Sequence, residues 1–158
     1  MSYQLDEYDR AILSALQGNG RLSNLELAEK INLSPSACHK RFRRLERDGI
    51  ITGYSAILNP DALGQGQSVF VQVTLEQQDS RSIERFEKAI TDVPEVAECY
   101  LMSGMYDYLV LVMVRDSSDY ERLHRQVLTN LPGVSRISSH FSIRAVSRRS
   151  YSVGASED

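Results

Sequence analysis

Five cationic side chains lie within one short segment of the sequence. The segment runs from Asn32 to Ile50, reads NLSPSACHKRFRRLERDGI, and carries Lys40, Arg41, Arg43, Arg44 and Arg47. The whole chain is acidic, with 18 Lys and Arg against 21 Asp and Glu. Guanidinium and ammonium groups bind phosphate oxygens, so this local positive charge is typical of a nucleic-acid contact. A local patch can act despite the net charge, because the Debye length is only about 8 Å at physiological salt.

A helix would separate these charges from an apolar stripe. Cys38, Phe42 and Leu45 are spaced by four and three residues, which predicts an inward face. Most polar residues then lie on the other side: Ser36, His39, Lys40, Arg43, Arg44 and Arg47. The first turns of a recognition helix reach base edges, so base contacts are expected from Ser36, His39 and Lys40. Phosphate contacts are expected from Arg41, Arg43, Arg44 and Arg47.

Helix-end signals place this basic segment third in a series of helices. Asp6 is suited to cap a first helix that ends near Gly18. Ser23 and Glu26 have the spacing of a capping box and start a second helix. Ser34 can cap the third helix and is also an expected DNA contact at its start. Pro35 would occupy the first helical position, where a missing N–H costs nothing. Because only about three residues separate the second helix from the third, the layout predicted is a helix-turn-helix.

The alternative is an ordinary helix with a solvated charged face. Arg43 and Arg44 each lie at helical spacing from Arg47, so like charges repel slightly, and Glu46 and Asp48 could offset this. Charge alone does not separate the two interpretations. The helix-turn-helix context favours DNA binding.

The composition changes after the third helix. Residues 50–58 have the character of an extended segment, and residues 59–67 contain Pro60, Gly64 and Gly66, which is typical of a linker. We therefore expect a DNA-binding domain over residues 1–50, an extended segment and linker over 51–67, a second domain over 68–147 and a polar tail over 148–158. A length of 158 residues is sufficient for two small domains.

The second domain alternates strands and helices. Val69, Val71 and Val73 predict one buried face of a first strand, and Ile83, Phe86 and Ile90 predict a helix. Two more strands are expected over residues 95–102 and 108–114. A capping box at Ser118 and Glu121 predicts another helix extending to Leu131, and a last strand is expected over 134–143. The order β-α-β-β-α-β is that of a ferredoxin-like fold, so the fold class is α+β with an N-terminal winged-helix-like domain.

A polar corner, SGMYDY (Ser103 to Tyr108), interrupts two apolar strands. Gly104 permits a tight backbone turn. Asp107 enters a strand otherwise made of Leu, Val and Met, and a carboxylate there should be paired or exposed. From the residues alone, a structural Asp that stabilises the corner is the preferred interpretation.

Other function classes lack their motifs in this sequence. We find no nucleophile elbow, P-loop, paired zinc ligands or dinucleotide fingerprint, so we expect no catalytic residues, no metal and no cofactor. Cys38 and Cys99 have no metal or redox spacing, although a disulfide between them is not excluded by sequence. The longest apolar run, near residues 108–114, is too short to span a bilayer. No secretory signal is evident, so a cytoplasmic location without membrane contact is expected.

Together these motifs resemble those of the Lrp/AsnC family of transcription regulators. The resemblance starts at LDEYDRAILSALQGNGRLSNLELAEKINLSPSACHKRFRRLERDGIITGYSAILNP, continues in ECYLMSGMYDYLV and NLPGV, and extends to about Val146. It implies an N-terminal DNA-binding domain and a C-terminal ferredoxin-like domain that binds small effectors and drives oligomerisation. The expected partners are therefore double-stranded operator DNA, an amino acid or related molecule, and further copies of the chain.

The resemblance also implies a pocket between subunits. One wall would be formed by Leu101, Ser103, Gly104, Asp107 and Tyr108. Part of another would be formed by Ser138, Ser139 and His140. Asp107 could accept hydrogen bonds from an α-ammonium group, and backbone N–H groups near Gly104 could bind an α-carboxylate. For His140, a hydrogen-bonded structural role is the competing interpretation.

Two other interpretations stay open at this point. One is an architectural DNA-binding protein that organises DNA without an effector, which differs from a regulator in its specificity ratio. The other is an RNA binder or protein adaptor of winged-helix type, which would show no preference for a duplex operator. Since one recognition helix reads few base pairs, at least a dimer is expected, which could assemble further to a tetramer or octamer. The expected contacts are residues 50–58 and the edges of the C-terminal sheet.

Overall fold

The described part of the chain forms two compact units. The structure is a computed structural model and describes residues 4–60 and 62–147. One unit ends and the other begins between Ile57 and Leu58, within the segment predicted to be extended and just before the predicted linker of residues 59–67. The predicted tail, residues 148–158, lies outside the described residues.

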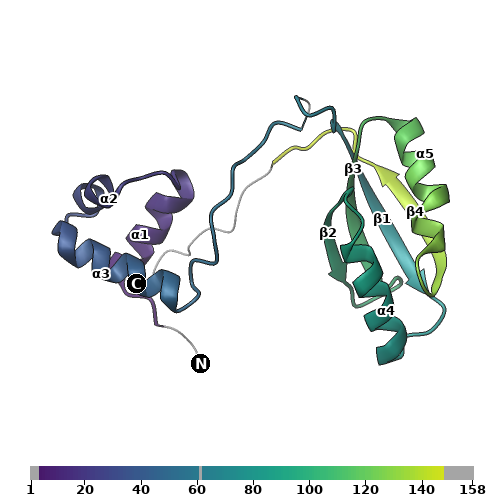
Figure 1. Cartoon of the computed structure of the whole chain (residues 1–158), viewed down its shortest axis with the longest axis horizontal. Helices are drawn as coiled ribbons and strands as arrows, with labels where there is room; N and C mark the ends of the chain where they lie inside the picture. The colour runs from purple at the N-terminus through teal and green to yellow at the C-terminus, as the bar shows by residue number, and fades with distance from the viewer. Residues whose placement is uncertain (1–3, 61, 148–158) are drawn as a thin grey trace. The chain divides into compact units, whose positions relative to one another are not determined.

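The first unit contains three helices, as the sequence predicts. They are α1 (Glu7–Gly18), α2 (Asn24–Lys30) and α3 (Pro35–Arg47) (Figure 1). Between α2 and α3 the chain turns at Asn32, whose φ of 55° is left-handed. Asn tolerates this region better than most residues, which allows so short a turn.

The helix starts follow the predicted capping signals. The Asp6 carboxylate accepts the Asp9 backbone N–H at 2.9 Å, and Ser23 and Glu26 form a reciprocal capping box. Ser34 accepts the backbone N–H of Ala37 at 3.3 Å. These bonds satisfy donors that the first turn of a helix leaves unpaired, so each cap defines where its helix begins.

A common apolar core holds the three helices together. Ile12 from α1, Leu27 from α2, and Cys38 and Leu45 from α3 are almost fully buried. Cys38 and Leu45 belong to the apolar stripe predicted for α3, and the third member, Phe42, packs partly buried against the same core. The inward face of α3 is therefore fixed, which leaves the opposite face for a partner.

The segment after α3 differs from a complete winged-helix domain. Residues 52–59 carry no assigned strand, and all the strands of the described chain lie in the second unit. Tyr54 contacts Glu46 of α3 through its hydroxyl, at 3.3 Å. Ile57 and Leu58 are exposed. Within residues 4–57, the domain thus has the three helices of the predicted fold without a paired wing.

The second unit is built on a four-stranded antiparallel sheet. The strands are β1 (Gln67–Leu75), β2 (Val96–Leu101), β3 (Tyr108–Val114) and β4 (Val134–Phe141), in the spatial order β2-β3-β1-β4. The two central strands are β1 and β3, so the first and third strands along the chain pair inside the sheet. This is the arrangement of a ferredoxin-like fold, which confirms the predicted fold class.

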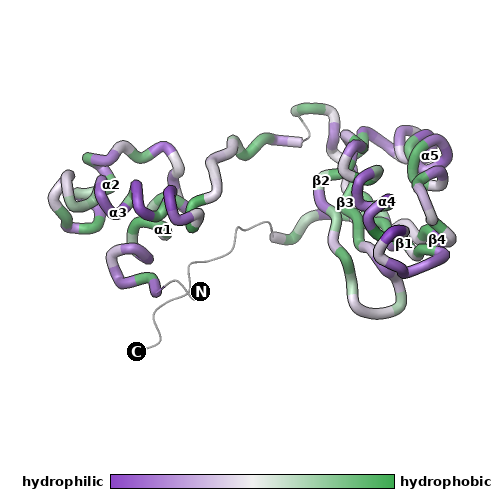
Figure 2. The backbone as a smooth tube through the Cα atoms, turned by 60° about the horizontal axis from the view of Figure 1, so that its bottom comes forward, coloured by the Kyte–Doolittle hydropathy of each residue, from purple (hydrophilic) through white to green (hydrophobic). Residues whose placement is uncertain are grey.

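Two helices cover one face of this sheet. They are α4 (Ser80–Thr91) and α5 (Ser117–Gln126), and a short 3-10 turn, η1 (Leu128–Asn130), follows α5 (Figure 1). Buried side chains from both helices pack on the alternate buried residues of β1 and β3, as the period of two predicts. Figure 2 shows hydrophobic and hydrophilic stretches alternating along these helices, which is the pattern of an element buried on one side.

The predicted cap of α5 is wrong. The residue that caps the helix is Asp116, whose carboxylate accepts the Asp119 backbone N–H at 2.8 Å. Ser118 lies in the first turn, so it cannot act as the cap that its spacing from Glu121 suggests. The helix also ends earlier than predicted, at Gln126, and the chain reaches Leu131 through the 3-10 turn.

This correction gives a test of the local structure. Replacing Asp116 by alanine should lower the free energy of unfolding by about 1 kcal/mol, the usual effect of losing an N-cap. Replacing Ser118 by alanine should change it by less than about 0.5 kcal/mol, as for an ordinary surface position. Urea unfolding followed by circular dichroism compares the two variants. A larger loss for Ser118→Ala would return the cap to the position predicted from sequence.

Both cysteines are free thiols. Cys38 is buried in the core of the first unit, and Cys99 is exposed on β2. The disulfide that the sequence left open is therefore absent from the structure.

Candidate nucleic-acid interface and ligand-binding corner

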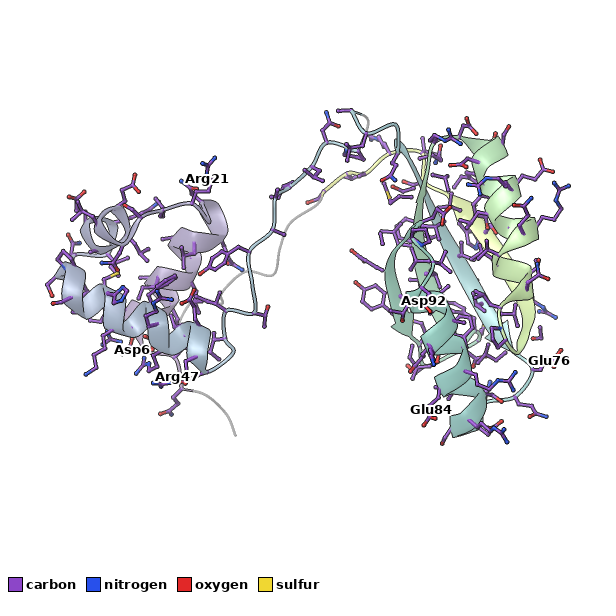
Figure 3. The ribbon with its side chains drawn as sticks, in the orientation of Figure 1. Asp6, Arg21, Arg47, Glu76, Glu84 and Asp92 are labelled. Carbon is purple, nitrogen blue, oxygen red and sulfur yellow. The ribbon has the colours of Figure 1, made fainter. Side chains whose placement is uncertain are left out.

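The exposed side of α3 carries an outer stripe of polar and cationic residues. We define this stripe as Ser36, Lys40, Arg43 and Arg47, which are spaced by four, three and four positions and are all exposed. The spacing places them on one helical face, opposite the buried Cys38. Arg47 lies at the C-terminal end of the helix (Figure 3). His39 is exposed beside the stripe.

The two arginines of the outer stripe have ionic partners at the same helix end, and the carboxylate side chains of these partners are each 27% exposed. Arg43 lies 3.1 Å from Glu46, and Arg47 lies 2.9 Å from Asp48. The arginine side chains are 66% and 74% exposed. Exposed ion pairs of this kind contribute about 0–1 kcal/mol, so a phosphate group can replace either carboxylate at little cost.

Arg41 and Arg44 point to α1 instead of the outer stripe. Their guanidinium groups share the Asp9 carboxylate: Arg41 Nη1 lies 3.0 Å from Oδ1, and Arg44 Nη2 lies 2.6 Å from Oδ2. The Asp9 side chain is 1% exposed. The sequence analysis grouped these arginines with the phosphate-binding set, and their place in the structure argues against it, because they neutralise a buried acid.

Asp6 completes this cluster. Its carboxylate lies 2.6 Å from Arg41 Nη1, and the Arg41 guanidinium carbon lies 5.2 Å from the centre of the Tyr8 ring. The hydrogen bond to Asp6 is the main cause that raises the pKa of Arg41. Burial opposes ionisation of Asp6, but hydrogen bonds from the Asp9 N–H and from Arg41 outweigh it and leave the pKa of Asp6 below its ordinary value. Asp6 and Arg41 therefore both stay charged at neutral pH.

The N-terminal end of α3 is tied to α2. The Asn24 side-chain amide donates to the Pro35 carbonyl at 2.8 Å. The Ser34 hydroxyl, which caps α3, lies 3.3 Å from the Ser36 hydroxyl. Ser34, also predicted to contact DNA, thus has a structural role at the helix start. Together these bonds fix the first turn of α3, where base contacts were predicted.

The corner of the second unit is held by Asp107. We define the corner as residues 102–107. The Asp107 carboxylate accepts the Leu75 backbone N–H at 2.7 Å and the Gln78 side-chain amide at 2.8 Å. Its own N–H donates to the Val73 carbonyl at 2.9 Å. The contacts fit the structural role preferred from the residues alone, although Asp107 acts on β1 and not on its own turn.

The corner and the preceding Leu101 expose apolar side chains together with a serine and a glycine. Leu101 is 60% exposed and Met105 is 96% exposed, and Ser103 is exposed between them. Gly104 has φ +147° and open space around its α-carbon. An added side chain there would strain the backbone, so the residue type matches the conformation.

The Tyr108 side chain points to the face of the sheet that α4 covers, and not to the pocket predicted from sequence. It is 1% exposed, its ring centre is 4.5 Å from that of Phe86 in α4, and its hydroxyl donates to Glu87 at 3.0 Å. Burial, and then the bond to Glu87, raise the pKa of Tyr108 above its ordinary range. Its side chain belongs to the core under α4, which corrects its assignment to the wall of the pocket.

The three predicted residues of β4 do not share one face. Ser138 and His140 face away from the helices, and the Ser138 hydroxyl lies 3.3 Å from His140 Nε2. Ser139 points to the helix side, where its hydroxyl hydrogen-bonds with the Tyr120 hydroxyl of α5. Neighbouring strand residues alternate between faces, so Ser139 cannot line the same wall as the other two.

Sequence reasoning missed several partners of these sites. The sequence pattern did not indicate Asp9, Gln78 or Glu87 as partners of the predicted site residues. The sequence did contain a signal for this cluster. Two acids at the start of α1, Asp6 and Asp9, are three residues apart, and Arg41 and Arg44 in α3 have the same helical spacing.

Two kinds of structure are absent from the described residues. None of the helices in residues 4–60 and 62–147 is both long and apolar enough to cross a membrane. Over the same residues, no group of three His, Cys, Asp or Glu side chains could hold a metal ion.

Comparisons with known proteins identify both units. The profile of winged helix-turn-helix DNA-binding domains matches residues 5–52, and the profile of the Lrp/AsnC ligand binding domain matches residues 68–151. The leucine-responsive regulatory proteins of Klebsiella pneumoniae and Escherichia coli are each 46% identical to the chain over 131 residues, which is 83% of this chain and 80% of each relative.

Solved structures give the same result. A transcriptional regulator of Neisseria meningitidis in complex with L-methionine superposes with a TM-score of 0.88 at 33% identity, covering 92% of this chain and 94% of that one. Escherichia coli AsnC superposes with a TM-score of 0.87 at 25% identity, covering 95% and 99%. The protein is thus a transcription regulator with a DNA-binding and a ligand-binding domain, and not an enzyme. The chain belongs to the Lrp/AsnC family.

Proposed function

We propose that the protein binds operator DNA through the outer stripe of α3 and that an amino acid bound to the second unit modulates this binding. The observation that carries the DNA part is the stripe itself: exposed cations at helical spacing on the third helix of a helix-turn-helix. Such a helix fits the major groove and can present donors to bases and phosphates together. The relatives are bacterial proteins, so a DNA partner favours a cytoplasmic location for this chain as well.

Within the stripe, base and phosphate contacts divide by position. Ser36 and Lys40, with His39 beside them, lie in the first two turns, which enter the groove most deeply in this class of domain. Arg43 and Arg47 lie nearer the helix end and are assigned to phosphates. Arg41 and Arg44 are removed from the proposed contact set because Asp9 binds them.

The amino-acid part of the proposal rests on the corner of the second unit. The Neisseria meningitidis regulator with the same fold was solved with L-methionine, which makes an amino acid the first class to test. The exposed side of the corner combines Leu101, Ser103 and a glycine backbone, which suits a small zwitterion with an apolar side chain. Asp107 and Tyr108 would shape this site from behind, since their side chains are engaged within the fold.

Self-association is the third part of the proposal. Within the described residues 58–60 and 62–146, the face of the sheet opposite α4 and α5 has no helix over it. This face carries Phe70, Tyr100, Leu109 and Leu111. Phe70 is 40% exposed and Tyr100 is 49% exposed. A patch of this kind is usually covered in solution, so we propose a dimer, with assembly to a tetramer or octamer beyond it. Sedimentation at micromolar concentration as a single-chain species would contradict this.

A ligand screen tests the effector. The purified full-length chain is heated in the presence of each of the twenty amino acids, and the melting temperature of the second unit is recorded. A ligand that binds the native state stabilises it by mass action, by about 2.7 kcal/mol when the free ligand concentration is 100 times Kd. This stabilisation raises the melting temperature. A rise with one or a few amino acids is expected. If none of the twenty changes the melting temperature, the amino-acid part of the proposal is wrong and the DNA part stands.

A further inference from the structure

The basic helix α3 carries two sets of cations with different partners. Lys40, Arg43 and Arg47 are exposed on the outer stripe. Arg41 and Arg44 lie on the flank next to α1, where both bind the carboxylate of Asp9. The total positive charge of the helix is therefore larger than the charge it presents to a partner.

We propose that Asp9 limits sequence-independent DNA affinity by holding Arg41 and Arg44 away from phosphate groups. This inference rests on the proposed DNA-binding function of α3. Asp9 belongs to the first helix and is far in sequence from the predicted contact surface. In this proposal Asp9 controls how many phosphates the recognition helix can neutralise.

The geometry makes Asp9 suited to this role. Its side chain is 1% exposed, and each of its two oxygens binds one guanidinium group, at 3.0 Å and 2.6 Å. The two arginine side chains are themselves 28% and 39% exposed. They lie close enough to the surface that a rotation of a long, flexible side chain would bring the charge into solvent, where a phosphate could bind it.

The burial of the partner carboxylates determines which arginines can bind a phosphate group. If a phosphate drew Arg44 away, the buried Asp9 carboxylate would lose a partner that it cannot replace with water, which is strongly unfavourable. The partners of Arg43 and Arg47 are Glu46 and Asp48, whose side chains are each 27% exposed against 1% for Asp9, so these carboxylates can regain water when the arginine leaves. The phosphate-binding set is therefore the outer stripe.

Neutralising Asp9 should release Arg44, whereas Arg41 keeps its ion pair with Asp6 at 2.6 Å. Each phosphate contact adds about 0.9 to the slope of log K against log salt, so the one released arginine would steepen the slope by about 0.9 per chain. At 0.15 M salt this corresponds to a gain of about 5-fold in affinity for a duplex of arbitrary sequence. The change from Asp to Asn keeps the shape of the side chain and removes only its charge.

The test measures salt dependence on a scrambled 24-base-pair duplex by fluorescence anisotropy between 50 and 200 mM salt. Asp9→Asn in the full chain is expected to steepen the slope and to tighten binding. Glu46→Gln is the matched control, because it removes an acid from an arginine that already faces DNA, and its slope should stay within about 0.3 of the parent's. An Asp9→Asn protein that is folded by circular dichroism but has an unchanged slope would overturn the proposal.

A second pair of variants keeps the test valid if Asp9→Asn does not fold. Arg44→Gln leaves Arg41 on Asp9 and should not change the salt slope, whereas Arg43→Gln should lower it by about 0.9. Equal reductions for the two variants would show that Arg44 binds phosphate and that Asp9 does not hold it. If the parent chain itself shows no salt-dependent duplex binding, the proposed DNA-binding function fails first, which is a different result.

Discussion

Replacing Arg43 and Arg47 together by alanine should lower the affinity of the protein for any duplex by about 30-fold for each chain in contact with DNA at 0.15 M salt. The two arginines are assigned to phosphates, and loss of two phosphate contacts removes about 1.8 from the salt slope. Because such contacts carry little sequence information, operator and scrambled duplexes should lose affinity by similar factors. Anisotropy titrations with both duplexes at several salt concentrations measure the effect.

The second unit offers a matched control for this charge change. Arg81 and Arg85 are also exposed, four residues apart on a helix, but they lie on α4. Their double replacement by alanine removes the same charge and should leave the salt slope unchanged. An equal loss of affinity in this control would mean that overall charge, and not the outer stripe of α3, determines DNA binding.

Replacing Asp107 by alanine should abolish the response to the amino acid and lower the free energy of unfolding of the second unit by about 1–3 kcal/mol. The physical reason is that the Leu75 N–H and the Gln78 amide both lose their acceptor, so the corner is no longer fixed against β1. A corner that is not fixed cannot hold its backbone donors in place for a ligand. The melting temperature with and without the ligand found in the screen measures both effects.

Asp107→Asn separates the structural role of this residue from a direct role in binding. The asparagine side chain retains an oxygen that can accept the Leu75 N–H, but it has no charge. If Asp107 only fixes the corner, the asparagine variant should keep most of its stability and still respond to the ligand. A stable asparagine variant without any ligand response would instead show that the carboxylate binds the ligand ammonium directly. An alanine variant with an unchanged ligand response would contradict the assignment of the corner.

The features predicted best from sequence are those determined by neighbouring residues. The caps at Asp6, Ser23 and Ser34 were correct because each depends on a side chain and a backbone N–H within three positions. The buried alternation of β1 was correct because only one face of the sheet carries helices. The order of the strands in space follows from the same elements with short connections.

The features that sequence missed depend on residues far apart in the chain. Arg44 was placed with the outer charges because helical spacing alone cannot show that Asp9, 35 positions away, lies beside it. Tyr108 was assigned to a pocket wall, yet the strand register turns its side chain to α4. Asp116 and Ser118 are both good N-caps, and the choice between them was made by where the preceding strand β3 ends.

The prediction of the effector site was the least complete for a physical reason. A pocket formed between subunits depends on how two chains pack, which the spacing of neighbouring residues does not encode. Within that chain, the alternation along β4 already divides Ser138 and His140 from Ser139. Leu101 and Ser103 are exposed in the structure, which is why the proposed ligand contacts start from them.

The most direct test of sequence-specific regulation is one affinity ratio. A duplex is selected from a randomised library with the purified protein, and its Kd is measured at 0.15 M salt beside that of a scrambled duplex of the same length. A sequence-specific regulator should prefer the selected duplex by at least about 10³-fold. A ratio near one, with both duplexes bound tightly, would contradict this account and would favour an architectural protein that binds DNA without reading its sequence.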